Sequence, residues 1–227
     1  MDFGKAFSFV FEDEDWLKKI AVGGLLSLIP VIGIFLVLGW GVEITKRVIN
    51  GDTEVLPDWS DFGGYLSRGF MVFVIAFLIF LPVILVQSCG SGLPFLTESY
   101  DQEALTTAMW VLSACFTCIT ILYSIVAYMI LPAAVARYAA TGEFGAAFKL
   151  GEIFKVVRNN LGTYAMVLLG GILASMVASL GTIACVIGVL FTTVYSFAIN
   201  GHLWGQAYKV SGSGTAIDST EPVPAAD

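Results

Sequence analysis

Two cysteines with the spacing of a metal or redox motif are the first residues that suggest chemistry. Cys115 and Cys118 are separated by two residues, as in many zinc sites and redox motifs. A structural zinc site usually takes four cysteine or histidine ligands, and the chain holds four cysteines and one histidine in all. The pattern therefore favours small thiols buried in a hydrophobic helix. We expect no metal and no cofactor.

Cys89 and Cys185 suggest a different chemistry, because both fall at the expected outer ends of hydrophobic segments. An oxidising compartment outside the membrane would allow a disulfide between them. Cysteine is also commonly just a small buried residue. The sequence favours two free thiols and leaves the disulfide open.

The other ionisable candidates lie at the edges of hydrophobic segments. Glu43 follows an apolar stretch, and acids within a membrane are often functional. Lys46 and Arg47 stand three and four residues later, which is the spacing of helical ion pairs. We therefore expect an interfacial ion pair. His202 has no acid nearby in the sequence, which favours a capping or interface role over a proton relay, and Asn200 is expected to hydrogen-bond between helices.

No pattern typical of an enzyme accompanies these residues. The sequence contains no Ser-His-Asp arrangement, phosphate-binding loop or metal-ligand motif. We expect no enzymatic activity and assign no catalytic, cofactor-binding or metal-binding residue. The net charge of -7 and the lack of a basic run also argue against nucleic acid as a partner.

The elements that carry these residues are hydrophobic. Apolar residues make up 57% of the chain and charged residues 13%, whereas a soluble domain is about a quarter charged. The first hydrophobic stretch, residues 20–40, contains no ionisable side chain. Lys18 and Lys19 precede it, and Lys46 and Arg47 follow it. Burial in a membrane accounts for this composition.

A break between Pro30 and Gly33 divides the first stretch. Proline removes a backbone donor and clashes with the preceding turn, and glycine frees the backbone beside it. Basic residues concentrate on the cytoplasmic side of a membrane, and a hairpin keeps both flanking basic pairs on that side. We therefore predict a hairpin with its bend between Pro30 and Gly33. The first arm is short for a span of about 20 residues, so the sequence leaves open whether this hairpin is re-entrant.

Two further hairpins follow from the same reasoning. Charge-free stretches at 70–86 and 105–136 form the second, and 161–208, with a bend at Gly181 and Thr182, forms the third. The predicted fold class is all-α: a polytopic membrane protein with about six membrane-embedded helices in three hairpins, together with amphipathic surface helices.

The surface helices are expected at 3–11 and 144–160, where apolar residues follow one helical face. Residues 1–210 are expected to form a single transmembrane domain and 211–227 a disordered acidic tail. With three hairpins, all 11 lysines and arginines lie on one side. We therefore expect a multi-pass protein of the cytoplasmic membrane with both termini in the cytoplasm.

Several short motifs, taken together, resemble a known family. They are Asp15-Trp16-Leu17-Lys18-Lys19-Ile20, Leu56-Pro57-Asp58-Trp59, Leu131-Pro132-Ala133-Ala134 and His202-Leu203-Trp204-Gly205-Gln206-Ala207-Tyr208. The chain resembles, over most of residues 5–210, the integral membrane proteins catalogued as the domain of unknown function numbered four-zero-one-three. The resemblance implies a prokaryotic, archaeal or bacterial, origin. It implies no known activity and supplies no functional residues.

Two classes of function fit these observations. The first is a non-enzymatic integral membrane protein with a structural, assembly or lipid-interacting role and membrane lipids as partners. The alternative is a small transporter or channel, suggested by the broken helix at Pro30 and Gly33. A polar cavity at mid-membrane would favour transport, and a dry packed core would oppose it. The sequence leaves protein partners and oligomeric state open.

Overall fold

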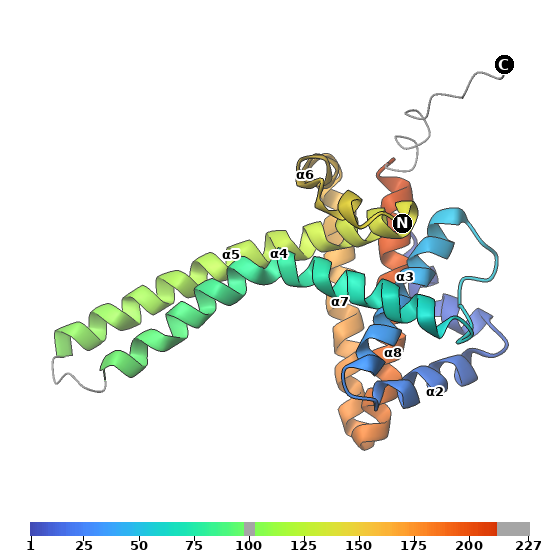
Figure 1. Cartoon of the computed structure of the whole chain (residues 1–227), viewed down its shortest axis with the longest axis horizontal. Coiled ribbons are helices and arrows are strands. Elements are labelled where there is room, and N and C mark those ends of the chain that lie inside the picture. The colour runs from blue at the N-terminus through green and yellow to red at the C-terminus, as the bar shows by residue number, and fades with distance from the viewer. Residues whose placement is uncertain (98–102, 213–227) are drawn as a thin grey trace, which may run out of the picture.

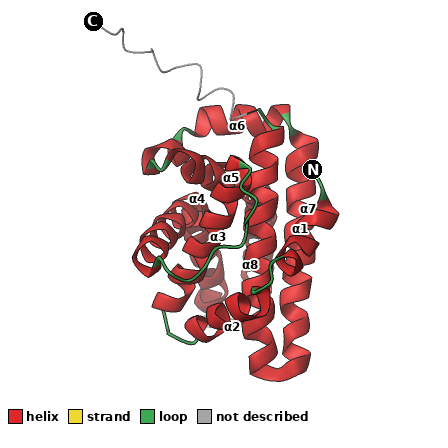
Figure 2. Ribbon diagram, turned by 90° about the vertical axis from the view of Figure 1, so that its right-hand side faces the viewer, coloured by secondary structure: helices red, strands yellow, loops and turns green. Residues whose placement is uncertain are grey.

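Every regular element in the described part of the chain is helical (Figure 2), which confirms the predicted all-α class. The computed structural model describes residues 1–97 and 103–212, and side chains over 1–88, 107–183 and 188–212. The expected tail at 211–227 lies outside the described residues beyond residue 212. The elements are α1 (Phe3–Ser8), η1 (Phe9–Glu12), α2 (Trp16–Ser27), α3 (Ile32–Asn50), α4 (Phe62–Thr97), α5 (Glu103–Thr141), η2 (Phe144–Phe148), α6 (Leu150–Asn159), α7 (Leu161–Leu180), η3 (Gly181–Ala184) and α8 (Cys185–Val210).

Two long helical pairs run across one another. In Figure 1, α4 and α5 lie side by side and project to the left of the molecule, and we call the projecting pair the arm. The α7–α8 pair runs vertically in the same view, joined at its lower end by η3. The remaining helices gather around α3 at the root of the arm, which we call the body. The arm therefore leaves the body at a steep angle to α7.

Helix α3 is the centre of the body because it packs on α4, α8, α2 and α5. The ring of Trp40 is completely buried and stacks on Trp59, with ring centroids 5.2 Å apart. The Trp40 indole donates a hydrogen bond to the carbonyl of Pro57 (2.9 Å), and the Trp59 indole donates to the carbonyl of Lys19 (2.7 Å). These contacts fix the loop after α3 against α2 and α3.

Glycines allow α3 to approach its neighbours closely. A Cβ atom on Gly39 would overlap the carbonyl oxygen of Tyr65 on α4, and a Cβ on Gly69 would overlap that of Phe35 on α3. On the other side, a Cβ on Gly205 of α8 would lie 2.6 Å from the Cβ of Val48. Small residues that let helix backbones meet are typical of membrane proteins.

The described part of the chain supports three membrane spans and not the expected six membrane-embedded helices. Three helical segments of the described chain are long and apolar enough to cross a membrane: Phe62–Ser88, Thr107–Thr141 and Leu161–Ile183. At 1.5 Å per residue α2 is about 18 Å long, against a hydrocarbon core of about 30 Å. The last turns of α3 carry Glu43, Lys46 and Arg47, and the second half of α8 carries several polar side chains.

The amphipathic segments also differ from the expectation. The segment 144–160 is not one helix, because the chain bends at Lys149 between η2 and α6. Phe148 is partly buried and packs against the core of the body. Near the N-terminus, α1 and η1 form in place of one helix at 3–11, and both Phe9 and Val10 are buried in the body. These segments use part of their apolar surface for internal packing, whereas Phe11, Leu150 and Phe154 are exposed.

The bend around Pro30 separates α2 from α3. Helix α2 ends at Ser27 and α3 begins at Ile32. Val31 between them has φ 67°, a conformation that β-branched residues rarely adopt. The N–H of Gly33 donates to the carbonyl of Ile29 (2.9 Å), and a Cβ on Gly33 would overlap the carbonyl oxygen of Leu26. The start of α3 therefore lies directly against the end of α2, with no room for a side chain.

Replacing Gly33 with alanine tests this close approach. We expect Gly33→Ala to destabilise the fold by about 1–3 kcal/mol, because backbone atoms have to move to admit the methyl group. Gly41→Ala is the matched control on the same helix, since its Cβ would meet its nearest neighbour at an ordinary 3.6 Å. Thermal unfolding of both variants in detergent measures the difference. Equal melting temperatures would contradict the proposed contact.

Candidate functional site

A cavity of about 660 Å³ lies in the angle between the arm and the α7–α8 pair. Its walls come from α5 at the root of the arm, from one face of α7 and from α8. The lining residues are Tyr128, Leu131, Pro132, Val167, Leu168, Gly171, Ile172, Ser175, Met176, Ser179, Asn200 and Trp204. The volume is within the range of about 300–1,000 Å³ of ordinary small-molecule sites.

The crossing of the two helical pairs produces this cavity. Pro132 lies within α5 where the arm joins the body, and α7 continues past this point at a steep angle (Figure 1). Helices that cross in this way diverge on either side of their contact. Apolar side chains of α5 and α7, such as Leu131 and Ile172, therefore face a space that no other helix fills.

The walls are mostly apolar, with a few polar groups and no charged side chain. The hydroxyls of Ser175 and Ser179 donate within their own helix, to the carbonyls of Gly171 (2.9 Å) and Met176 (2.7 Å). The Nδ2 atom of Asn200 donates to the carbonyl of Ser196 one turn earlier in α8 (2.9 Å). The sequence had suggested a hydrogen bond between helices. The bond that Asn200 donates lies instead within α8. The Asn200 side-chain oxygen remains available as an acceptor.

A glycine keeps the space in front of Asn200 open. A Cβ built on Gly171 of α7 would lie 3.3 Å from the Oδ1 atom of Asn200. A larger side chain at this position would extend into the cavity. Gly170 has a different role, because a Cβ there would press against Leu203 of α8. The small residues of α7 therefore serve both helix packing and the cavity.

The structure places Glu43 in an ion-pair network that the sequence indicated only in part. Its carboxylate lies 3.7 Å from Arg47 in the same helix and 3.6 Å from Arg68 of α4. Arg68 also pairs with Asp61 at 2.8 Å. Lys46 has no ion-pair partner among the described residues. The Arg68 contact links α3 to α4, and the distance of 25 positions between Glu43 and Arg68 leaves no local sequence signal for it.

The cysteines do not form a site in the described part of the chain. Cys115 and Cys118 are free and exposed on the arm, so they are not buried between helices of this chain. The side chains of Cys89 and Cys185, and with them the open question of a disulfide, lie outside the described residues. No group of three or more potential metal ligands occurs among the described side chains.

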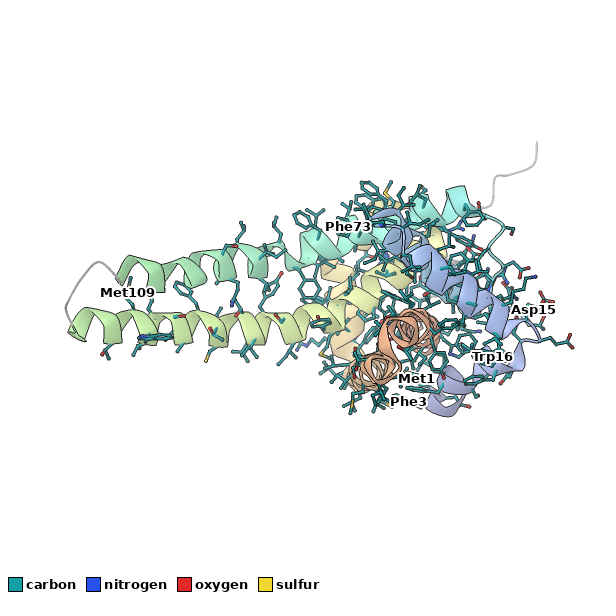
Figure 3. All side chains as sticks on the ribbon, turned by 90° about the horizontal axis from the view of Figure 1, so that it is seen from below. Met1, Phe3, Asp15, Trp16, Phe73 and Met109 are labelled. Carbon is teal, nitrogen blue, oxygen red and sulfur yellow. The ribbon has the colours of Figure 1, made fainter. Side chains whose placement is uncertain are left out.

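His202 lies in a polar cluster that holds the N-terminus on α8. It is 3% exposed, and its ring stacks on Phe9 with the centroids 4.5 Å apart. The Gln206 side-chain oxygen accepts from the N–H of Asp2 (2.7 Å), so the Gln206 amide nitrogen must face the Nδ1 atom of His202 at 3.0 Å. Nδ1 is then the acceptor and the ring is neutral. Figure 3 shows Met1 and Phe3 beside the α7–α8 pair.

Burial determines the protonation of His202. Loss of solvent, followed by the nearby charge of Lys5, lowers its pKa from 6.5 to about 4, with Asp2 acting weakly in the opposite direction. The unfolded chain therefore binds a proton at a higher pH than the folded chain does. It follows that the contribution of His202 to stability is complete above about pH 6.5 and declines as the pH falls toward about 4.

Stability measured against pH tests this assignment. Because His202 stays uncharged in the folded protein, the free energy of unfolding should be about 2 kcal/mol lower at about pH 5 than at about pH 7. Each unit of pKa difference corresponds to about 1.4 kcal/mol. We expect the melting temperature in detergent to fall from pH 7 to pH 5, and His202→Gln to remove part of that fall. Identical pH profiles for the two proteins would show that His202 does not titrate differently on folding.

The comparisons with known proteins identify the family and nothing more specific. No curated protein and no solved structure matches the chain. A family model matches residues 22–187, which is more than half of the sequence and includes most of the cavity-lining positions. The chain belongs to the family described as "Protein of unknown function (DUF4013)".

Proposed function

We propose that this chain is a non-enzymatic integral membrane protein that interacts with lipid, and that its arm crosses the bilayer. The observation that carries the proposal is the arm itself, in which apolar side chains are exposed along most of two long helices. Trp110 is 64% exposed and Leu122 is 67% exposed. Figure 3 places Met109 far from the body, near the free end of the arm. Water is a poor solvent for such a surface and a bilayer is a good one.

The charges at the two ends of the arm support an orientation. Arg68 stands near the start of α4 and Arg137 near the end of α5, both at the root. The sequence that connects the far ends of these helices contains Glu98 and Asp101 but no lysine or arginine. Because basic residues remain preferentially on the cytoplasmic side, the proposal places the body and both termini in the cytoplasm.

Helix α7 then lies along the inner membrane surface. It runs across the arm, so the two cannot both follow the membrane normal (Figure 1). The face of α7 next to the arm exposes Ile172 and Met176. Helix α6 exposes Leu150 and Phe154 and also carries basic residues. These faces are suited to the boundary between headgroups and acyl chains.

Transport is the second candidate, motivated in the sequence by the broken helix at Pro30 and Gly33. An aqueous path needs polar lining, and the cavity walls are mostly apolar and uncharged. We therefore give preference to the lipid-interacting role. Reconstituted liposomes that release trapped ions or small solutes faster than protein-free liposomes would favour the transporter or channel.

Labelling of single cysteines tests which helical pair crosses the membrane. In a chain whose four native cysteines are replaced by serine, Ala108→Cys reports the far end of the arm and Thr182→Cys the end of the α7–α8 pair. We expect a membrane-impermeant maleimide to reach position 108 from outside intact cells. Position 182 should react only after the membrane is opened.

Thr53→Cys, in the exposed loop before α4, is the control for the cytoplasmic side. It should behave like position 182. Labelling of position 182 from outside, with position 108 protected, would show that α7 and α8 cross the bilayer instead. Recovery of the protein in the soluble fraction after cell lysis would contradict membrane integration altogether.

A further inference from the structure

We propose that the cavity between α5, α7 and α8 binds an uncharged lipid that carries a hydroxyl group, with the hydroxyl between Asn200 and Trp204. The inference rests on the proposed function, because the cavity can take up a lipid only if the body lies at the membrane. It adds the chemical class of the ligand and the residues that recognise it. Asn200 and Trp204 are four residues apart in α8 and therefore lie on one face of the helix.

The walls select against a charged ligand. No lysine, arginine, aspartate or glutamate lines the cavity, so a phosphate or ammonium group inside it would lose its hydration without gaining a counter-charge. Burying an unpaired charge in this way costs many kcal/mol. An apolar chain meets no such penalty along Leu131, Ile172 and Met176. The ligand is therefore a lipid whose polar end is neutral.

The polar atoms of the cavity fit a hydroxyl group. The Oδ1 atom of Asn200 accepts no hydrogen bond from the described residues, because the bond of this side chain to Ser196 uses Nδ2. The indole N–H of Trp204 has no acceptor among the described residues. A ligand hydroxyl would donate to Asn200 and accept from Trp204. A hydroxyl is the smallest neutral group that satisfies both.

The surrounding residues support the same ligand. Ser175 and Ser179 have already used their hydroxyl hydrogens within α7, so they offer no competing donor. Gly171 leaves the space in front of Asn200 free. The α5 and α7 walls belong to segments apolar enough to span a membrane. Lipid, and not water, is thus the medium from which the cavity is filled.

A photoreactive long-chain alcohol tests the proposal on the full chain in phosphatidylcholine nanodiscs. The probe is octadecanol with a diazirine in its chain, and cross-linked peptides are mapped by mass spectrometry. We expect cross-links to the α7 segment that lines the cavity. Unlabelled octadecanol should compete for the site, whereas octadecyl methyl ether should compete about tenfold less well because it cannot donate to Asn200, a difference of about 1.4 kcal/mol.

Two variants locate the site on the protein. Gly171→Leu should fill the cavity and reduce cross-linking at least about fivefold. Gly162→Leu on the same helix is the matched control, since a Cβ there meets no atom within 4 Å, and it should leave cross-linking unchanged. Asn200→Leu should abolish the preference for the alcohol over its methyl ether. The competition experiment on the unsubstituted protein tests the same hydrogen bond by changing the ligand instead of the protein.

Three outcomes would overturn the inference. Cross-links spread evenly over the outer surface of the arm would indicate ordinary bilayer contact. Equal competition by the methyl ether would remove the role of the hydroxyl. Stronger competition by octadecyl phosphate would indicate an anionic ligand. If position 108 is labelled from outside and any of these outcomes is observed, the proposed membrane orientation stands. Only the proposed ligand is then refuted.

Discussion

The close approach of α3 to α4 and α8 is the packing on which the rest of the molecule depends. Gly39 and Gly69 bring the backbones of α3 and α4 into contact, and Gly205 does the same for α8 against α3. Contacts made by backbone atoms leave little freedom in crossing angle, because no side chain is present to rearrange. The direction in which the arm leaves the body is therefore fixed at the Gly39–Gly69 contact. The α3–α8 contact likewise fixes the α7–α8 pair.

This geometry limits how the molecule can meet a bilayer. Three segments have the length and composition of membrane spans, but α7 runs across α4 and α5. A planar membrane can align only one of these directions with its normal. The arm exposes apolar side chains such as Leu85, Trp110 and Leu122, whereas α7 packs one face on α8. A helix that is apolar all round belongs within the hydrocarbon, and a helix with one covered face also suits its boundary.

The sequence predicts what depends on local pattern and misses what depends on crossing angles. The structure shows the predicted all-α class, the helices at 70–86 and 105–136 and a helix break around Pro30. These features depend on hydropathy and proline, which act locally. Three segments have the length and composition of membrane spans instead of about six, because α2 is short and the last turns of α3 carry charged residues. Nothing in the sequence places Arg68 beside Glu43, and nothing marks the cavity except the polar Asn200 in an apolar segment.

The cavity also follows from the glycine contacts, and an empty cavity reduces the stability of the body. An apolar cavity of about 660 Å³ deprives its lining atoms of the dispersion contacts that a packed interior provides. Water finds few hydrogen-bond donors there, because the hydroxyl hydrogens of Ser175 and Ser179 and the Nδ2 atom of Asn200 have partners within their own helices, and most of the cavity lining is apolar. A lipid chain restores the lost contacts without requiring the helices to move. Because such a ligand binds the folded state and not the unfolded chain, it should stabilise the fold in proportion to its occupancy. In the proposed binding mode, the lipid would therefore help to hold α7 in place beside the arm.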